Sequence, residues 1–316
     1  MNRRIIGRLR AKVKRQKTGR LALRQSELDG ITIGEALREA AQMLRRAGLS
    51  DARREAASLL AHAIERDRTF LLTHDDEPLS YESARLFRAL IERRARGEPL
   101  QYIRGRQEFY SLDFEVTPDV LIPRPETELL VEAALRLLDE GQAEGALVCD
   151  VGTGSGCIPV TILHERARVR AVGLDISEAA LGVAGRNAAR HKVRERLALV
   201  ASDCFDALDE RRARFNLIVS NPPYVAEGAL AGLQREVRDH EPRVALTPGS
   251  DGLRIIRRLL VESARFLKTG GHLLMEIGYD QHEAVRQLTD ERTWQLLDIH
   301  RDLQGIPRTV ALRKKS

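Results

Sequence analysis

The stretch FNLIVSNPPYV, residues 215–225, decides the fold of this chain. Its first five residues form a short apolar run that ends in β-branched side chains, which is typical of a buried parallel strand. Pro222 and Pro223 end the run, because neither can donate a backbone hydrogen bond and each restricts the preceding residue to extended conformations. We therefore expect Asn221 at the carboxyl end of a strand, where open α/β sheets bind their ligands.

The turn NPPY at residues 221–224 offers two hydrogen-bond acceptors at one point. Asn221 has a side-chain carbonyl, and Pro222 has a backbone carbonyl outside the expected strand. Two converging acceptors would hold both hydrogens of a planar NH2 group, and the ring of Tyr224 would stack on its π-system. The alternative, which stays open for this motif alone, is a rigid strand exit in which a buried Asn221 caps the turn.

A second motif, DVGTGSG at residues 150–156, joins an expected strand to an expected helix. Its glycines let the backbone turn sharply and lie against a ligand. The spacing differs from the dinucleotide-binding pattern, because Cys157 stands where that pattern requires its third glycine. Asp150 precedes the turn and would accept hydrogen bonds from a cationic amino-acid group.

Two further acids follow at the ends of the next expected strands. Asp175 is suited to accept hydrogen bonds from both hydroxyls of a ribose. In the motif SDCF at residues 202–205, Asp203 would accept from the exocyclic amine of an adenine. Each acid alone is more often a solvated loop residue, but acids at three successive strand ends predict a cofactor site.

From residue 146 onward, expected strands alternate with expected helices. This alternation predicts an α/β fold with a mostly parallel, doubly wound sheet. The expected strands are residues 146–149, 169–174, 197–201, 215–219, 272–276, 295–300 and 308–312. The expected helices are residues 157–165, 177–191, 228–236, 251–267 and 280–289, the fourth with Asp251 as its N-cap.

From about Thr32 to Gly97 the pattern is helical instead. Thr32 and Glu35 have the spacing of a capping box, and Ser50 and Ser80 are expected to cap later helices. Alternation at residues 109–116 predicts a hairpin, and Pro125 suits the first turn of a helix. The expected domains are a small all-α bundle at 31–104, a β-hairpin linker at 105–123 and the α/β domain at 124–316.

Positive charge is concentrated at the start of the chain. Residues 1–30 hold ten of the 52 Lys and Arg residues and two of the 46 Asp and Glu residues, so residues 31–316 carry a formal net charge of −2. A protein that grips a nucleic-acid backbone should spread positive charge over its folded surface, and this body does not. Residues 1–30 are expected to form a disordered basic tail, with a frayed helix or an over-extended start as alternatives.

Hydropathy and cysteine content exclude other classes of protein. No apolar stretch approaches the roughly 18–20 residues of a membrane helix. The three cysteines, Cys149, Cys157 and Cys204, are odd in number and contain no Cys-x-x-Cys pair. A reducing compartment without structural zinc is therefore expected.

Taken together, the motifs at residues 150–156, Asp175, 202–205 and 221–224 resemble those of class I S-adenosylmethionine-dependent methyltransferases. A narrower resemblance, to the HemK/PrmC family of release factor glutamine N5-methyltransferases, covers about residues 32–313. It is carried by IPRPETE (122–128), NPPYV (221–225), HEP (240–242) with AL (245–246), GSDGL (249–253) and EIG (276–278).

The resemblance implies a seven-stranded methyltransferase domain, S-adenosyl-L-methionine as cofactor, and a cytoplasmic enzyme of translation termination. Its substrate would be the glutamine of the Gly-Gly-Gln motif in class-one peptide chain release factors, methylated on the side-chain N5. The implied substrate-binding residues are Asn221, Pro222, Pro223 and Tyr224, with Asn221 catalytic. With Asp203 from the strand-end reasoning, the expected cofactor-binding residues are Gly152, Thr153, Gly154, Ser155, Gly156, Asp175, Asp203, Cys204 and Asn221, and no metal is expected.

One position departs from the family, which commonly has an aromatic residue, often Trp, where this chain has Cys204. A backbone contact to adenine, or the ring of Phe205, would take its place. Three alternative functions remain: N5-glutamine methylation of a ribosomal protein, N6-adenine methylation of a nucleic acid, and a non-enzymatic cofactor-binding module. Neither membrane attachment nor stable nucleic-acid binding is expected, with a possible exception for the basic tail.

Overall fold

The computed structural model describes residues 30–141, 145–212 and 214–315. Contacts divide this part of the chain into two compact units, one ending at Arg104 and one beginning at Gly105. The predicted basic tail lies outside the described residues, apart from Gly30.

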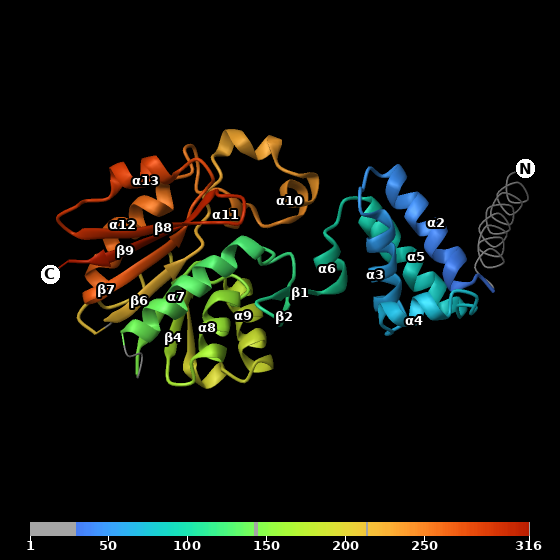
Figure 1. Ribbon diagram of the computed structural model, residues 1–316, viewed down its shortest axis with the longest axis horizontal. Coiled ribbons are helices and arrows are strands. Elements are labelled where there is room, and N and C mark those ends of the chain that lie inside the picture. The colour runs from blue at the N-terminus through green and yellow to red at the C-terminus, as the bar shows by residue number, and fades with distance from the viewer. Residues whose placement is uncertain (1–29, 142–144, 213, 316) are drawn as a thin grey trace, which may run out of the picture. The chain divides into compact units, whose positions relative to one another are not determined.

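The described residues of the unit that ends at Arg104 form helices and connecting loops, with one isolated β-bridge between Thr32 and Pro78. Its helices are α2 (Ile33–Arg46), α3 (Ala52–Ala63), α4 (Arg68–Thr73), α5 (Tyr81–Ala95) and α6 (Leu100–Arg104) (Figure 1). The expected capping box is confirmed, because Thr32 and Glu35 each donate a backbone N–H to the other's side chain. Ser80 likewise caps α5.

Two features of this unit differ from the prediction. The N-cap of α3 is Asp51, not Ser50, and its side chain makes no capping hydrogen bond. Ala52 and Ala56 are almost fully buried at the start of α3, so packing sets this end without help from a cap. Helix α6 was not predicted, since five residues are too few to show a periodic pattern.

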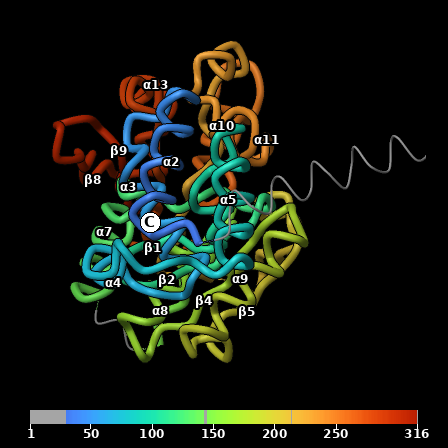
Figure 2. Tube along the Cα trace, turned by 90° about the vertical axis from the view of Figure 1, so that its right-hand side faces the viewer, coloured from blue at the N-terminus to red at the C-terminus, as the bar shows by residue number. Residues whose placement is uncertain are grey.

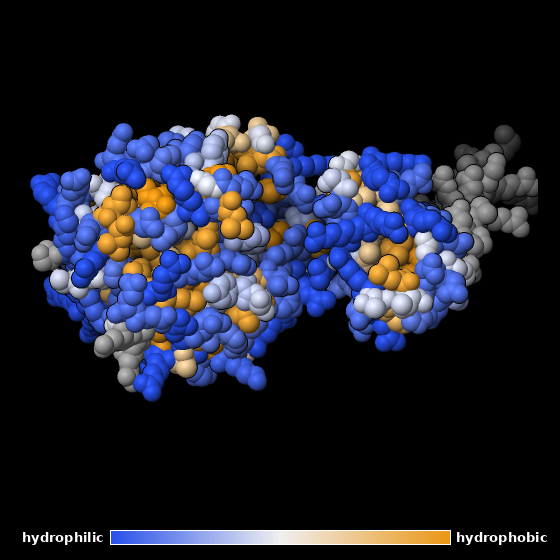
Figure 3. All heavy atoms as spheres, viewed as in Figure 1, coloured by the Kyte–Doolittle hydropathy of each residue, from blue (hydrophilic) through white to orange (hydrophobic). Residues whose placement is uncertain are grey.

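Hydrophobic atoms gather over α2 and α5 on the face of this unit seen in Figure 3. A groove there is lined mainly by apolar side chains, those of Ile31, Ala36, Ala40, Met43, Ala84, Phe87 and Ile91. It lies between α2 and α5, and five residues of its lining also belong to the hydrophobic core of the unit: Ala36, Ala40, Ala84, Phe87 and Ile91.

The unit that begins at Gly105 contains a seven-stranded sheet in the order β5-β4-β3-β6-β7-β9-β8. The strands are β3 (Leu147–Val151), β4 (Arg170–Asp175), β5 (Leu197–Ala201), β6 (Phe215–Ser220), β7 (Leu267–Glu276), β8 (Trp294–Arg301) and β9 (Pro307–Lys314). Strands β3 to β7 are parallel, and β9 runs antiparallel to both of its neighbours. Figure 2 shows the β4–β5 and β8–β9 edges on opposite sides. The predicted doubly wound α/β fold is confirmed.

Helices cover both faces of this sheet (Figure 1). One hydrophobic cluster packs strand residues against α7 (Glu128–Glu140), α8 (Cys157–Glu165) and α9 (Glu178–Arg190). A second cluster packs the other face against α12 (Arg254–Phe266) and α13 (His282–Leu288), and it includes the almost fully buried Trp294. The two cores pack against the strands from both faces, and the loops that form the candidate site begin at the carboxyl ends of these strands.

The expected hairpin is present as β1 (Arg106–Phe109) and β2 (Leu112–Glu115). Tyr110 and Ser111 form its two-residue turn, and both have positive φ values, as a type I′ turn requires. Asn187 on α9 holds the hairpin, since its side chain accepts from the Glu115 N–H and donates to the Glu115 carbonyl.

The long connection after β6 differs most from the prediction. The helix expected at 228–236 is instead a 3-10 helix, η3 (Glu227–Gly232), followed by α10 (Arg235–His240) and α11 (Arg243–Leu246). Neither η3 nor α10 buries a residue, so no apolar stripe favours one continuous helix.

Asp251 is not the N-cap of α12, because the helix begins after Leu253. Its side chain accepts from the Leu253 N–H and pairs with Arg257. Gly252 has a φ of +72°, a left-handed conformation that keeps the helix from starting earlier. In the described residues, no helix combines the length and apolar character needed to cross a membrane.

Candidate active site

A pocket lies where β3, β4, β5 and β6 end, at the carboxyl edge of the sheet. Because parallel neighbours end on the same edge, four loops far apart in sequence meet there. Of the predicted site residues, the pocket is lined by Gly152, Thr153, Gly154, Ser155, Asp175, Asp203, Cys204, Asn221, Pro222 and Pro223. Gly156 and Tyr224 do not line it.

The three glycines of the turn after β3 all have positive φ but serve different purposes. A Cβ on Gly152 would meet no atom within 4 Å, and one on Gly154 would meet only the Gly152 carbonyl at 4.0 Å. A Cβ added to Gly156 would instead lie only 3.0 Å from the Cβ of Ala184. The first two therefore leave open space for a ligand, whereas Gly156 lets α8 pack closely on α9.

Asp150 lies beneath this turn and is fully buried. Neither of its carboxylate oxygens has a hydrogen-bond partner among the described residues, and the same holds for the buried hydroxyl of Thr153. Burial raises the pKa of the Asp150 carboxyl to about 7; the Thr153 hydroxyl, which is near the carboxylate but outside hydrogen-bond geometry, opposes that rise, and the charge of Asp175 adds to it.

Asp175, at the end of β4, already holds the glycine turn in place. One of its carboxylate oxygens accepts the Gly154 N–H at 2.8 Å, and the other accepts the Ser177 N–H at 2.9 Å. Burial raises the pKa of this carboxyl, and the two backbone hydrogen bonds oppose that rise. Since each carboxylate oxygen has two lone pairs, acceptor capacity remains for a ligand in the pocket.

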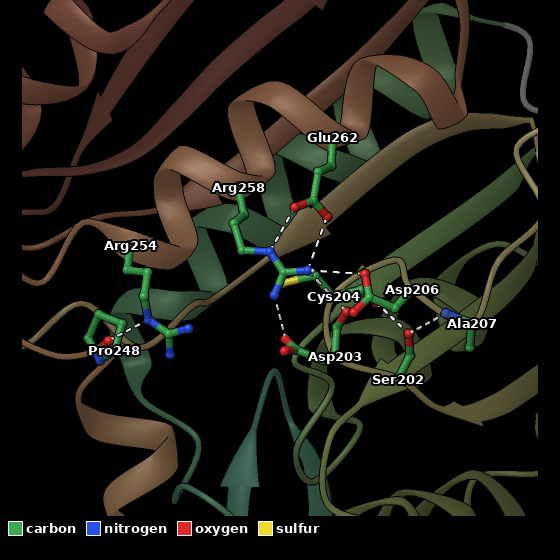
Figure 4. A network of polar contacts seen from close by, with 9 residues as sticks. All are labelled: Ser202, Asp203, Cys204, Asp206, Ala207, Pro248, Arg254, Arg258 and Glu262. Carbon is green, nitrogen blue, oxygen red and sulfur yellow. Dashed lines mark hydrogen bonds and ion pairs between the residues drawn. The ribbon is translucent and has the colours of Figure 1, made fainter.

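Asp203 lines the pocket but does not stand free to meet an adenine. Its carboxylate accepts from Arg258 on α12 at 2.6 Å, and Arg258 also pairs with Asp206 and Glu262 (Figure 4). In Figure 4 the guanidinium of Arg258 lies between the loop after β5 and the next turn of its own helix. Arg258 was not predicted, because nothing in the sequence links positions 203 and 258.

Cys204, where the resemblance implies an aromatic residue, lines the pocket and is 7% exposed. It has a φ of 49°, and burial raises the pKa of its thiol to about 11, which keeps the group neutral. Phe205 does not replace the aromatic residue, because it stacks on Phe266 with ring centroids 4.9 Å apart and is only 2% exposed.

Asn221 follows β6 directly, as expected, and its side-chain NH2 donates to the hydroxyl of Thr127 at 3.0 Å. Neither the Asn221 side-chain carbonyl nor the Pro222 backbone carbonyl accepts a hydrogen bond from any described residue. Both residues line the same pocket as the glycine turn. The two acceptors therefore remain available to a ligand.

Tyr224 is not among the residues that line the pocket. Its ring packs against the hydrophobic core on the α12 side of the sheet, and its hydroxyl donates to Glu276 at 3.2 Å. Burial, and after it the charge of Glu276, raises the pKa of the phenol. The expected stacking of this ring on a ligand stays a prediction, because the contacts of the ring described here are with the core and with Glu276.

Four residues near the pocket were not predicted as site residues: Arg124, Thr127, Glu241 and Glu276. Arg124 pairs with Glu241, whose side chain is 1% exposed and also accepts the Ile122 N–H. This pair joins the loop before α7 to the loop that contains α10 and α11. IPRPETE resembled an ordinary helix start, so only the recurrence of such motifs in the family could have signalled these roles.

Comparisons with known proteins agree with this geometry. A model of the PrmC N-terminal domain matches residues 35–105, and a model of the methyltransferase small domain matches residues 126–237. The release factor glutamine methyltransferase of Nitratidesulfovibrio vulgaris is 43% identical over 285 residues, which cover 90% of this chain and 95% of that protein. The chain belongs to the release factor glutamine methyltransferase family.

Other members of the release factor glutamine methyltransferase family are similarly close. The protein of Burkholderia pseudomallei is 45% identical over 85% of this chain and 94% of its own length. That of Koribacter versatilis is 42% identical over 90% of this chain and 99% of its own length. The family membership predicted from the motifs is confirmed, and the chain is a methyltransferase. Among the described residues, no group of three His, Cys, Asp or Glu side chains is placed to hold a metal.

In this methyltransferase, Asp150→Asn is expected to stabilise the ligand-free protein at pH 8. The pKa of the Asp150 carboxyl in the folded state is about 7, above its ordinary value of 3.8. Above pH 7 the carboxyl is therefore charged and buried without a hydrogen-bond partner, which lowers the stability of the folded protein. The gain is a few kcal/mol, at about 1.4 kcal/mol per unit of pKa difference. The gain should shrink as the pH falls from 7 toward 4 and be lost below the ordinary value of 3.8, where the carboxyl is protonated in both the folded and the unfolded state.

Urea unfolding of both forms at pH 8 and pH 5 would measure this difference. The exposed acid Asp76 supplies a control, since Asp76→Asn should change stability little at either pH. An Asp150→Asn protein less stable than wild type at pH 8 would contradict the unpaired state of the carboxylate.

Proposed function

We propose that this methyltransferase transfers a methyl group from S-adenosyl-L-methionine to the side-chain N5 of the glutamine in the Gly-Gly-Gln motif of class-one peptide chain release factors. The proposal depends on one observation: the carbonyl groups of Asn221 and Pro222 accept no hydrogen bond from a described residue, and both residues line the pocket that the glycine turn also lines. The names of the relatives support this choice of substrate.

Several features of the pocket fit S-adenosyl-L-methionine. Gly152 and Gly154 leave room for a ligand against the backbone, and Asp175 retains acceptor capacity for ribose hydroxyls. The unpaired carboxylate of Asp150 and hydroxyl of Thr153 provide buried acceptors beneath the turn that favour a positively charged ligand above. When bound, this cofactor supplies a methyl group on a sulfonium.

Asn221 and Pro222 would make the side-chain amide nitrogen of the substrate glutamine able to accept a methyl group. A carboxamide nitrogen is a poor nucleophile, because its lone pair is delocalised into its carbonyl. If Asn221 and Pro222 accept both N–H hydrogens of the glutamine, they orient the group and stabilise the positive charge that develops on nitrogen. Such positioning is worth roughly 7–11 kcal/mol over free collision. The nitrogen would keep both hydrogens while its bond to the methyl carbon forms and the bond from that carbon to sulfur breaks, and would then lose one proton to solvent, so no general base is required before methyl transfer.

The helical unit, residues 31–104, has a different role in this proposal. Its separate hydrophobic core and the match to the PrmC N-terminal domain support a function in recognising the protein substrate. A release factor as substrate also supports a cytoplasmic location for the enzyme.

Labelled methyl transfer would test the proposed substrate. The full chain is incubated with labelled S-adenosyl-L-methionine and a purified release factor, with the Gly-Gly-Gln glutamine either intact or changed to alanine. Label is expected on the intact factor alone. Ribosomal proteins and adenine-containing nucleic acid, incubated in parallel, test the two alternative substrates.

Each outcome has a distinct meaning. Label on the alanine form would show that the target lies elsewhere in the factor. Label only on a ribosomal protein or a nucleic acid would replace the proposed substrate with that alternative. Absence of label on all of them, with cofactor binding retained in calorimetry, would favour a binding module.

A further inference from the structure

A chain of buried hydrogen bonds ends on the side-chain amide of Asn221. Asn221 donates to the Thr127 hydroxyl at 3.0 Å, and Thr127 donates to one carboxylate oxygen of Glu276 at 2.6 Å. The Tyr224 hydroxyl donates to the other oxygen at 3.2 Å. Thr127 is 2% exposed and Glu276 is 1% exposed, so water has little access to these bonds. The participants come from the turn before α7, the end of β7 and the turn after β6.

The direction of each bond follows from the charge on Glu276. An ionised carboxylate can only accept hydrogen bonds, so the hydroxyls of Thr127 and Tyr224 must both donate to it. Thr127 has one hydroxyl proton, and this bond uses it. Toward Asn221 it therefore presents only lone pairs, and the Asn221 amide must point its NH2 at Thr127.

This direction matters because an asparagine side chain has nearly the same shape when its amide is rotated by 180°. Packing alone cannot distinguish the two orientations, but their hydrogen bonding is opposite. In the observed orientation the carbonyl end of Asn221 stays available as an acceptor. In the rotated orientation the NH2 group of Asn221 would face the NH2 group of the substrate glutamine, and neither group could accept a hydrogen bond from the other.

We propose that Thr127 and Glu276 are positioning residues that hold the Asn221 amide in the one orientation able to accept a hydrogen bond from a substrate amide. The inference rests on the proposed function, because the substrate NH2 defines which orientation is useful. It also gives the motifs at 122–128 and 276–278 a common purpose. One supplies the hydroxyl, and the other supplies the carboxylate that orients it.

The hydrogen bonds to Glu276 and the positive charge of Arg308 limit the rise of its pKa, so the carboxyl is ionised at neutral pH. Burial raises the pKa of its carboxyl to about 6. The hydrogen bonds from Thr127 and Tyr224 oppose the rise, as does the positive charge of Arg308 on β9. Glu126, beside Thr127 in the chain, adds to the rise.

Protonation of Glu276 would remove this control. A protonated carboxyl can donate to Thr127, whose own proton can then turn toward Asn221 and favour the rotated amide. The thiol of Cys157, on α8, stays neutral in this pH range, because burial raises its pKa to about 12. The rate of methyl transfer should therefore fall as the pH drops below about 6.

Three variants of the full chain test the proposal by methyl transfer to a purified release factor. Thr127→Val keeps the shape but removes the hydroxyl, and should lower kcat about 10- to 100-fold while the KM for S-adenosyl-L-methionine changes by less than about twofold. Thr127→Ser restores the hydroxyl and should recover kcat to within about threefold of wild type. Glu276→Gln can donate to Thr127 at any pH, so it should be impaired without the low-pH fall.

Thr161→Val is the matched control. Thr161 is fully buried on α8, and its hydroxyl has no hydrogen-bond partner among the described residues. It does not line the pocket. Equal loss of kcat in the Thr127→Val and Thr161→Val proteins would contradict the proposal, and so would a Thr127→Val protein with the kcat and pH profile of wild type.

A measurement without substrate separates this inference from the proposed function. The side-chain NH2 of Asn221, observed by NMR, should exchange slowly with solvent in wild type and in Thr127→Ser, and faster in Thr127→Val. Fast exchange in wild type would overturn the orientation argument. Slow exchange in a protein that methylates no release factor would support the orientation and refute the proposed substrate.

Discussion

Replacing Asn221 with alanine is expected to lower kcat for methyl transfer by at least about 100-fold, the usual cost of losing one group that stabilises a developing charge. The variant loses one of the two acceptors that would hold the glutamine NH2, and the Pro222 carbonyl alone does not fix its orientation. The glycine turn and Asp175 are untouched, so binding of S-adenosyl-L-methionine in calorimetry should change much less.

Asn216→Ala provides the control for this variant. Asn216 lies near the opposite end of the same strand, where its side chain accepts from the Leu147 N–H and from Lys268. The Asn216→Ala protein should retain the kcat of wild type. Asn221→Asp should be impaired as well, because an oxygen would replace the NH2 that donates to Thr127. Equal losses of cofactor binding and turnover in Asn221→Ala would contradict the role of this side chain as an amide clamp.

Gly252→Ala is expected to lower both stability and activity. Gly252 has a φ of +72°, and alanine in that conformation costs about 1–2 kcal/mol. An added Cβ would also lie 2.3 Å from the backbone carbonyl oxygen of Tyr224, so the turn after β6 would have to move. The unfolding free energy should fall by at least about 2 kcal/mol, and kcat should fall because Asn221 shares that turn.

Gly305→Ala is the control that distinguishes the effect of backbone strain at the substituted residue from the effect of moving the turn after β6. Gly305 has a φ of +79°, but a Cβ there would meet no atom within 4 Å. It should therefore lose stability through backbone strain alone and keep its turnover number. If both variants lowered kcat equally, the close approach of Gly252 to Tyr224 would not be what supports the site.

The sheet could be predicted because its signals are local. The run at 215–219 and the two prolines after it set the end of β6, and the glycine turn at 152–156 similarly marks the end of β3. Parallel pairing then brings those ends together, and with them Asp175 and Asn221. The helix expected at 228–236 failed for the opposite reason, since residues that bury no side chain give the chain little reason to form one helix.

The residues that orient the site could not be predicted, because each acts through a partner far away in sequence. Thr127 and Glu276 are 149 residues apart, and Arg258 is 55 residues from Asp203. Tyr224 shows the same limit: the NPPY motif places the residue, but the buried carboxylate of Glu276 decides where its ring points.

The position of β9 has a consequence for the order in which the sheet is assembled during translation. In the described residues β8 pairs with β9 alone, although β9 is synthesised later, and β9 also covers the edge of β7. Translation that stopped between residues 301 and 307 would thus leave β8 without a partner and one edge of β7 open, and an open edge invites aggregation. For this topology, we expect a chain that ends before β9 to aggregate rather than to fold into a less active enzyme.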